Sequence, residues 1–251
     1  MTFAVPADAY DRFMGRYSTQ LAAQMADLAG IEAGQRVLDV GCGPGALTTE
    51  LVARVGAESV SAVDPSQQFV EAARERHPGV DVRRSAAEEL PFPDATFDAA
   101  IAQLVVHFMA DPGRGLAEMV RVTRPGGAVA ACVWDHAGEQ TPLAIFWRAA
   151  RELFPGVEGE TDMTGSREGQ LGELFTRAGL REVEETALPV RVEHASFEEW
   201  WDPFTLGVGP AGSFYAEQDE EGRRLLRERC RELFTPPFTM SARAWAAHGR
   251  A

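Results

Sequence analysis

The chain has 251 residues, 45% of them hydrophobic and 25% charged, with a formal net charge of −14. This length fits one large α/β domain, and the acidic balance argues against a nucleic-acid-binding protein, which needs a basic face. No apolar run reaches the roughly 20 residues that a bilayer requires, and residues 1–15 lack the basic-then-apolar order of a signal peptide. We therefore expect a cytoplasmic protein with no membrane and no nucleic-acid partner.

The basic residues and the cysteines exclude further classes. All 24 basic residues are arginine, so neither a Schiff-base lysine nor a P-loop lysine is available. Cys42, Cys132 and Cys230 lie far apart and form no C-x-x-C pair, which predicts neither a disulfide framework nor a zinc cluster. No spacing of His, Cys, Asp or Glu suggests a metal site.

Helix-like and strand-like segments alternate from residue 18 to about residue 187. Apolar periodicity predicts helices over residues 18–30, 46–55, 67–76 and 113–122. Short apolar runs predict strands over residues 35–40, 59–63, 80–84, 97–106 and 128–134. This alternation predicts a parallel sheet with helices on both faces.

The second half of the chain is less regular. Helical patterns cover residues 143–154, 167–178, 196–201 and 217–234, and strand-like segments cover 180–185 and 238–248. No internal repeat interrupts this order, so the sequence predicts one continuous domain with helical insertions.

The strongest local signal is the segment of residues 37–45, which reads Val-Leu-Asp-Val-Gly-Cys-Gly-Pro-Gly. It predicts a strand end, a sharp turn and a helix start. Glycine is needed where the backbone adopts positive φ or must approach a ligand closely, and the free N–H groups of a helix start favour an anionic group. The segment therefore predicts a small-molecule site.

Two ligand classes fit this loop. Gly41, Gly43 and Ala46 satisfy the dinucleotide-binding fingerprint, and Asp64 would be its ribose-binding acid. A nicotinamide-dinucleotide-binding oxidoreductase is thus an alternative. Asp39 argues against it, because a carboxylate beside the first glycine repels a pyrophosphate but suits the ammonium group of a bound amino acid.

The chain also resembles a known family in four blocks, which occur in order and at normal spacing: residues 37–45, 62–66, 87–98 and 124–127. Residues 36–134 are similar to the class I S-adenosylmethionine (SAM)-dependent methyltransferases of the ubiquinone/menaquinone-biosynthesis-like (methyltransferase type 11) group. The resemblance implies that SAM is the cofactor and that its methyl group passes to a small-molecule acceptor.

The resemblance implies an α/β, Rossmann-like fold: a seven-stranded, mostly parallel sheet with helices on both faces, an antiparallel last strand over 238–248, and helical cap insertions. Residues 1–251 would form a single methyltransferase domain. Its parts would be an N-terminal cap over 1–30, a SAM-binding core over 31–134, and acceptor-pocket insertions over 135–166 and 194–236.

The family's cofactor site can be carried over by position. Asp64 would accept both ribose hydroxyls, and Phe69 would cover the adenine. Ala86 stands where the family usually has an aspartate for the adenine amino group, so Glu88 would replace that acceptor. The full set of residues that the resemblance implies is Arg16, Asp39, Gly41, Cys42, Gly43, Asp64, Pro65, Phe69, Ala87, Glu88 and Gln103.

Residues 9–18 resemble a recurrent N-terminal block of the family. They place two tyrosines and a phenylalanine beside two arginines. Such a segment can fold over the cofactor as a mobile lid and exclude water. Within it, Arg16 would pair with the carboxylate of the methionine moiety.

Methyl transfer is an in-line displacement in which positioning supplies most of the rate. A general base is needed only if the acceptor loses a proton, and the candidates are His107, then His136 and Asp135. Aromatic residues of the insertions would offer surface to an apolar or aromatic acceptor: Trp147, Trp200, Trp201, Phe204 and Phe214. Ala86 and the lack of an obvious base leave a non-catalytic SAM-binding protein as an alternative.

Overall fold

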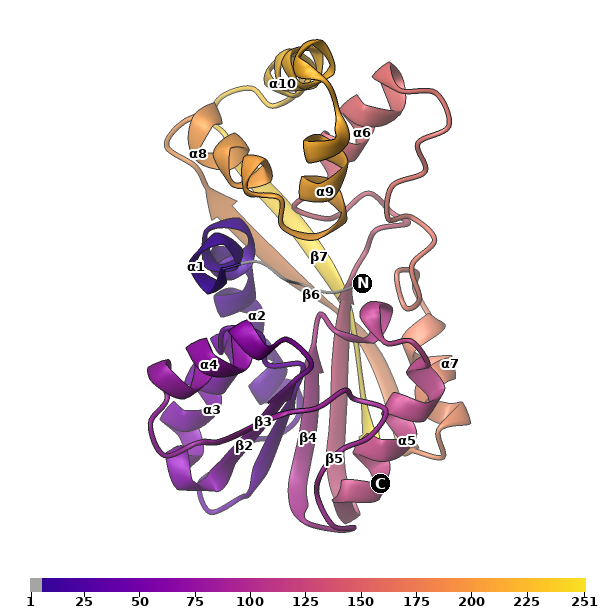
Figure 1. The fold of residues 1–251 in the computed structure, drawn as a ribbon. Coiled ribbons are helices and arrows are strands. Elements are labelled where there is room, and N and C mark those ends of the chain that lie inside the picture. Colours follow the sequence, from indigo (N-terminus) through magenta and orange to yellow (C-terminus); the bar gives the residue numbers. More distant parts are fainter. Residues whose placement is uncertain (1–5) are drawn as a thin grey trace.

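A computed structural model describes residues 6–251 and shows one seven-stranded sheet in the order β3-β2-β1-β4-β5-β7-β6 (Figure 1). β7 runs antiparallel between β5 and β6, and the other strands are parallel to one another. The predicted fold class is therefore confirmed. The strands are β1 (Val37–Val40), β2 (Val60–Asp64), β3 (Asp81–Arg84), β4 (Phe97–Gln103), β5 (Thr123–Trp134), β6 (Arg181–Glu193) and β7 (Thr239–Arg250).

Helices cover both faces of this sheet, and the central strands β1, β2 and β4 are therefore buried on both sides. Along β4, Ile101 packs into the core on the side of α2 and α3, whereas Ala100 and Ala102 pack toward α5 and α7. This alternation follows from the two-residue period of a strand. The flanking helices are α2 (Arg16–Leu28), α3 (Ala46–Val55), α4 (Gln67–Arg76), α5 (Pro112–Val122) and α7 (Gln170–Arg177), with short turns η2 (Ala57–Ser59) and η3 (Val106–Phe108).

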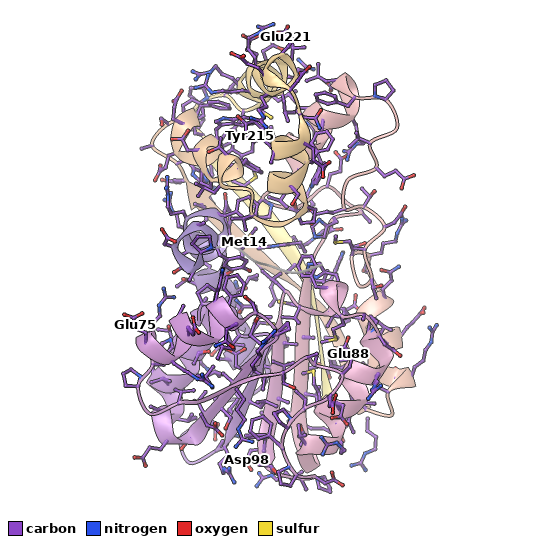
Figure 2. All side chains as sticks on the ribbon, in the orientation of Figure 1. Met14, Glu75, Glu88, Asp98, Tyr215 and Glu221 are labelled. Carbon is purple, nitrogen blue, oxygen red and sulfur yellow. The ribbon has the colours of Figure 1, made fainter. Side chains whose placement is uncertain are left out.

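A helical cap lies beyond the carboxyl ends of the parallel strands, where the long β6 and β7 extend to meet it (Figure 1). Its helices come from the two segments that the sequence marked as insertions: α6 (Ala144–Leu153), α8 (Phe197–Trp201), η4 (Asp202–Leu206), α9 (Gly209–Glu217) and α10 (Glu220–Leu233). Figure 2 places Tyr215 and Glu221 in this cap, Asp98 at the opposite end of the molecule, and Met14 between them.

The N-terminal helix begins earlier than the sequence pattern predicted. A helical run starts with α1 (Ala7–Tyr10), continues through the π-helical η1 (Asp11–Gly15) and joins α2. The first five residues of the predicted N-terminal cap lie outside the described residues. Within residues 6–251, no helix is long and apolar enough to cross a membrane.

Candidate functional site

The predicted cofactor residues converge on a cavity of about 300 Å³ at the carboxyl ends of β1, β2 and β4. These strand ends meet at one edge because the strands are parallel and the chain order reverses beside β1. Most of the predicted residues line it: Gly41, Gly43, Asp64, Pro65, Phe69, Ala87, Glu88 and Gln103. Arg16, Asp39 and Cys42 do not.

Two glycines let the loop that follows β1 pass close to the cavity. Gly41 has φ +72° and Gly43 has φ +53°, a conformation that other residues rarely adopt. A Cβ atom on Gly41 would also lie 2.4 Å from a methyl carbon of Val105. The loop therefore requires glycine at position 41 for both conformation and space.

Asp64 is the last residue of β2, and its carboxylate is held from two sides. Oδ2 accepts the backbone N–H of Gly43 at 2.9 Å, and Oδ1 accepts that of Ser66 at 2.8 Å. Burial raises the pKa of Asp64 to about 6, although these two hydrogen bonds favour the charged form. The carboxylate is thus fixed in the cavity wall, with further lone pairs for hydroxyl donors.

Two buried acceptor atoms near the first loop have no hydrogen-bond partner in residues 6–251: Oδ1 of Asp39 and Oε1 of Gln103. The Thr48 hydroxyl donates to the other Asp39 oxygen at 2.6 Å, and the Gln103 amide donates to the Ser18 carbonyl at 3.0 Å. Burial raises the pKa of Asp39 to about 7. Unpaired buried acceptors are costly, so these atoms call for a donor from a ligand.

At the other end of the cavity, Phe69 packs edge-to-face with Tyr10, with ring centres 5.3 Å apart. Tyr10 lines the cavity from the N-terminal helix. Ala86 and Glu88 lie in the same wall, and Glu88 accepts the backbone N–H of Asp111 at 3.2 Å. The Glu88 side chain thus has one oxygen committed to the protein and the other available.

Cys42 and Arg16 depart from their predicted positions. The Cys42 thiol is buried and points at the Gly43 carbonyl, 3.5 Å away, so it stays behind the loop. Arg16 donates to Glu199 at 2.7 Å and to the Glu193 carbonyl at 2.6 Å. The start of α2 faces the cap, which holds Arg16 outside the cofactor cavity. The structure gives no contact between Arg16 and the other predicted residues.

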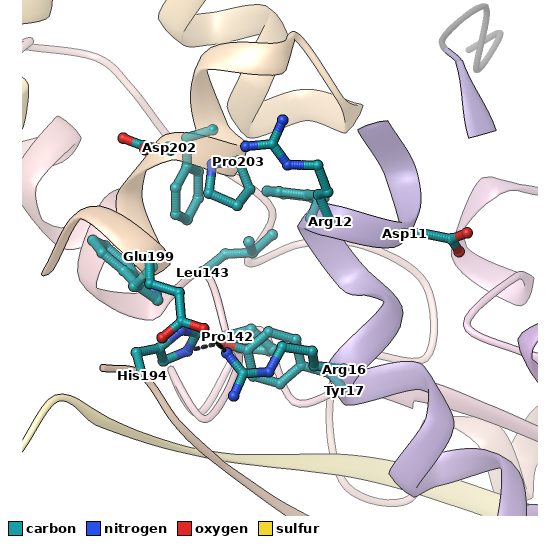
Figure 3. Close-up of a pocket in the computed structure, with 13 residues that line it drawn as sticks. Asp11, Arg12, Arg16, Tyr17, Pro142, Leu143, His194, Glu199, Asp202 and Pro203 are labelled. Carbon is teal, nitrogen blue, oxygen red and sulfur yellow. Dashed lines mark hydrogen bonds and ion pairs between the residues drawn. The ribbon is translucent and has the colours of Figure 1, made fainter. Parts of the chain in front are cut away.

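A second cavity of about 270 Å³ lies between the N-terminal helical run and the cap. Figure 3 shows Arg16 and Tyr17 on the helix, facing Glu199 and His194, and Arg12 extending toward Pro203. The Tyr17 hydroxyl lies 2.9 Å from Nε2 of His194. Buried aromatic and apolar side chains complete the wall: Phe13, Leu143, Trp200 and Phe204.

A third, small cavity of about 40 Å³ lies between these two. It shares Tyr10, Leu104 and Phe108 with the cofactor cavity, and it shares Phe13 and Leu143 with the second one. Its polar lining residues are His107 from η3, His136 from the turn after β5, and Glu160. The two predicted histidine candidates thus face one space beside the cofactor cavity.

Asp135, the remaining candidate base, has a structural role. Its carboxylate accepts Nε of Arg243 at 3.0 Å and a second guanidinium nitrogen of that residue. It also accepts the backbone N–H of Gly138 at 2.8 Å. A buried carboxylate held by three donors anchors the turn after β5 and is not free to take a proton from an acceptor.

Sequence reasoning missed several lining residues. Leu104 and Val105 were assigned to the fourth strand, but that strand ends at Gln103, and Leu104 adopts φ +60° as the chain turns into the cavity. Glu160 lies in an irregular segment between α6 and α7 and is 3% exposed, bound to the Trp147 indole N–H at 2.7 Å. Its glycine- and threonine-rich neighbours gave no local signal for burial.

A family model described as a methyltransferase domain matches residues 38–131. An uncharacterized methyltransferase of Mycobacterium tuberculosis is 32% identical over 186 residues, which cover 74% of this chain and 70% of the relative. A rice chloroplastic 2-methyl-6-phytyl-1,4-hydroquinone methyltransferase is 35% identical over 150 residues, 59% of this chain but only 39% of that enzyme. Among solved structures, a SAM-dependent methyltransferase of Aquifex aeolicus is 26% identical, with a TM-score of 0.52 over 71% of this chain and 86% of that one.

Proposed function

Because the chain belongs to the SAM-dependent methyltransferase family, we propose that it transfers the methyl group of SAM to a small apolar or aromatic acceptor. Family membership argues against the nicotinamide-dependent alternative, and a turnover assay separates an enzyme from a non-catalytic SAM-binding protein. SAM supplies an activated methyl group on a sulfonium centre, so the protein's task is to align the acceptor and exclude water.

The unpaired acceptor atoms at the cofactor site match the donor groups of SAM. Asp39 and Gln103 each hold a buried acceptor atom without a partner in residues 6–251, and an amino-acid ammonium group would supply their donors. Asp64 would accept the ribose hydroxyls, and Phe69 with Tyr10 would enclose the adenine ring. We assign the wall over Ala86, Ala87 and Glu88 to the adenine edge.

The proposed binding place of the acceptor follows from the arrangement of the three cavities. The second cavity has buried aromatic and apolar side chains as well as charged ones in its walls, and it shares Phe13 and Leu143 with the small cavity, which borders the cofactor cavity. An acceptor body held among Trp200 and Phe204 could thus present its reacting group to the cofactor. Aromatic walls bind flat apolar molecules and exclude water from the transfer point.

The proposal is tested by following release of S-adenosylhomocysteine with a panel of phenols, hydroquinones, carboxylic acids, amines and hydroxylated polyketides. We expect turnover with a small molecule from this panel. Methyl label that enters only protein or RNA fractions of a cell extract would contradict the proposal.

The path is tested separately by Leu143→Trp, which would fill the junction between the second and small cavities. Since Leu143 does not line the cofactor cavity, affinity for S-adenosylhomocysteine should stay within about twofold of wild type, while turnover should fall at least about tenfold. Leu143→Met keeps the volume and serves as the control. Unchanged turnover in Leu143→Trp would exclude this path.

A further inference from the structure

Two histidines line the small cavity, His136 buried and His107 partly buried, and each has a buried ring nitrogen without a partner in residues 6–251. Nδ1 of His107 and Nε2 of His136 are both buried, and neither has a hydrogen bond in the part of the chain that the structure describes. The ring centres lie 5.7 Å apart, so both rings can reach a single small polar group between them. Buried polar atoms are normally paired, and these two therefore point to a polar group that enters the cavity from outside the protein.

The surroundings keep both rings uncharged. Burial holds the pKa of His107 well below its ordinary value, and the neighbouring His136 acts in the same direction. Burial lowers the pKa of His136 to about 4, against the opposing effect of Asp135. Asp135 is already bound by Arg243, and Glu160 is bound by the Trp147 indole. Near neutral pH each imidazole thus offers one lone pair and one N–H donor.

We propose that the acceptor presents a hydroxyl group between His107 and His136, that its oxygen is the atom methylated, and that His107 takes the hydroxyl proton. This inference rests on the proposed function and names the acceptor class of the same site. His136 is assigned as a positioning residue that hydrogen-bonds the same hydroxyl.

The step balances without a further reactant. The acceptor oxygen forms a bond to the methyl carbon while the bond between that carbon and sulfur breaks, and the pair of electrons stays on sulfur. The O–H proton passes to the imidazole of His107. One positive charge leaves the sulfonium centre and one appears on the imidazolium, so the net charge of the enclosed site is unchanged.

His107 is preferred as the base because of its place in the chain. The residues around it in the turn after β4, Leu104, Val105 and Phe108, line the cofactor cavity. His136 and Glu160, in contrast, line a further void, which lies on the cap side of the small cavity. The proton acceptor must touch the reacting oxygen, which lies on the cofactor side.

A neutral pair of histidines suits a hydroxyl better than an amine or a carboxylate. An ammonium group would bring a second positive charge beside the sulfonium centre, and it has no lone pair with which to attack the methyl carbon. A carboxylate is already ionised near neutral pH and needs no base. A hydroxyl arrives uncharged and must lose a proton, which matches what the cavity offers.

The test compares His107→Gln and His136→Gln with wild type, using ring-substituted phenols and naphthols that differ in hydroxyl pKa. In His107→Gln, methylation of an unactivated phenol should fall about 100-fold or more, the usual contribution of a general base. The loss should be much smaller for a nitrophenol that is already ionised in solution. Calorimetry should give wild-type affinity for S-adenosylhomocysteine, and products should carry the methyl group on oxygen.

His248→Gln is the matched control, because His248 lies on β7, paired with Glu184 and outside the three cavities. Equal losses for both phenols in His107→Gln, or a larger loss in His136→Gln, would overturn the assignment of the base. Turnover only with amines, carboxylates or carbon nucleophiles would overturn the acceptor class and leave the proposed function standing. Absence of small-molecule turnover would instead remove the proposed function itself.

Discussion

At the scale of single residues, two buried carboxyl groups at the cofactor site are costly to keep charged: Asp64 in the cavity wall, and Asp39 on β1, two residues before Gly41. Burial raises the pKa of Asp39 to about 7 and that of Asp64 to about 6. Both must be ionised to accept hydrogen bonds from an ammonium group and from ribose hydroxyls. Protons therefore compete with the ligand for these two sites.

This competition predicts that binding of S-adenosylhomocysteine depends on pH. The ligand favours the ionised carboxylates, so affinity should be full above the higher pKa, near about pH 8, and should decline as pH falls through about 7 and about 6. We expect a loss of at least about tenfold between about pH 8 and about pH 5.5. Calorimetry across this range measures it.

Asp39→Asn provides the control for the pH dependence. The variant should bind more weakly at about pH 8, because a neutral amide attracts an ammonium group less strongly than a carboxylate does, and its remaining pH dependence should be shallower. An affinity for S-adenosylhomocysteine that stays constant from about pH 8 to about pH 5.5 would contradict this prediction, because it would show that neither carboxyl group takes up a proton in that range.

The residues that could be predicted are those whose role is local. Gly41 and Gly43 are recognisable because a turn with positive φ needs glycine wherever it occurs. Arg16 could not be placed, because its partner Glu199 is 183 positions away and no pattern near either residue pairs them. Glu160 was missed for the same reason: only the folded cap brings it against Trp147.

At the scale of elements, periodic segments were predicted well and irregular ones were not. The bounds of α3 and α4 agree with the sequence pattern, because each has a clear apolar stripe. β6 was expected to end at residue 185 but extends to Glu193, past Pro189, which a strand at the sheet edge tolerates. α9 was missed because it begins Gly209-Pro210 and lacks an amphipathic pattern.

The N-terminal helical run is the element most suited to act as a lid. Tyr10 packs on Phe69 in the cofactor cavity, and Asp11 pairs with Arg76 at the end of α4 at 2.5 Å. The run passes through a π-helical segment, a form that is rare and often marks functional sites. Its contact with the cofactor cavity is thus made by a short, irregular stretch of chain.

We predict that the backbone amides of residues 8–18 exchange rapidly with solvent in the free protein and slowly with S-adenosylhomocysteine bound. The reason is that Tyr10, which lines the cofactor cavity, gains a packed ligand surface that adds to the contacts the segment already makes with Phe69 and Arg76. Hydrogen exchange followed by mass spectrometry measures the change, with α5, on the far face of the sheet, as the internal reference. Strong protection that is identical in both states would make this segment a fixed helix.

At the scale of the whole molecule, the helical cap contributes to the second cavity but not to the cofactor cavity. Every residue that lines the cofactor cavity lies between Tyr10 and Ala110, so none comes from the cap. The second cavity, in contrast, is closed by Trp200, Phe204 and their neighbours in the cap. Loosening the cap should therefore affect only one of the two ligands.

Leu226→Ala tests this division. Leu226 is fully buried on α10, which packs against α6, and its truncation should destabilise the protein by about 2–4 kcal/mol. We expect affinity for S-adenosylhomocysteine within about twofold of wild type, since the cofactor cavity contains no residue of the helical cap. Turnover should be at least about tenfold lower, because the second cavity loses its fixed wall. Calorimetry and product release measure the two effects.

Leu225→Ala is the control, because it changes an adjacent leucine that is 37% exposed and should alter neither cofactor affinity nor turnover. Parallel losses of cofactor affinity and turnover in Leu226→Ala would show that the cap and the cofactor cavity act as one unit.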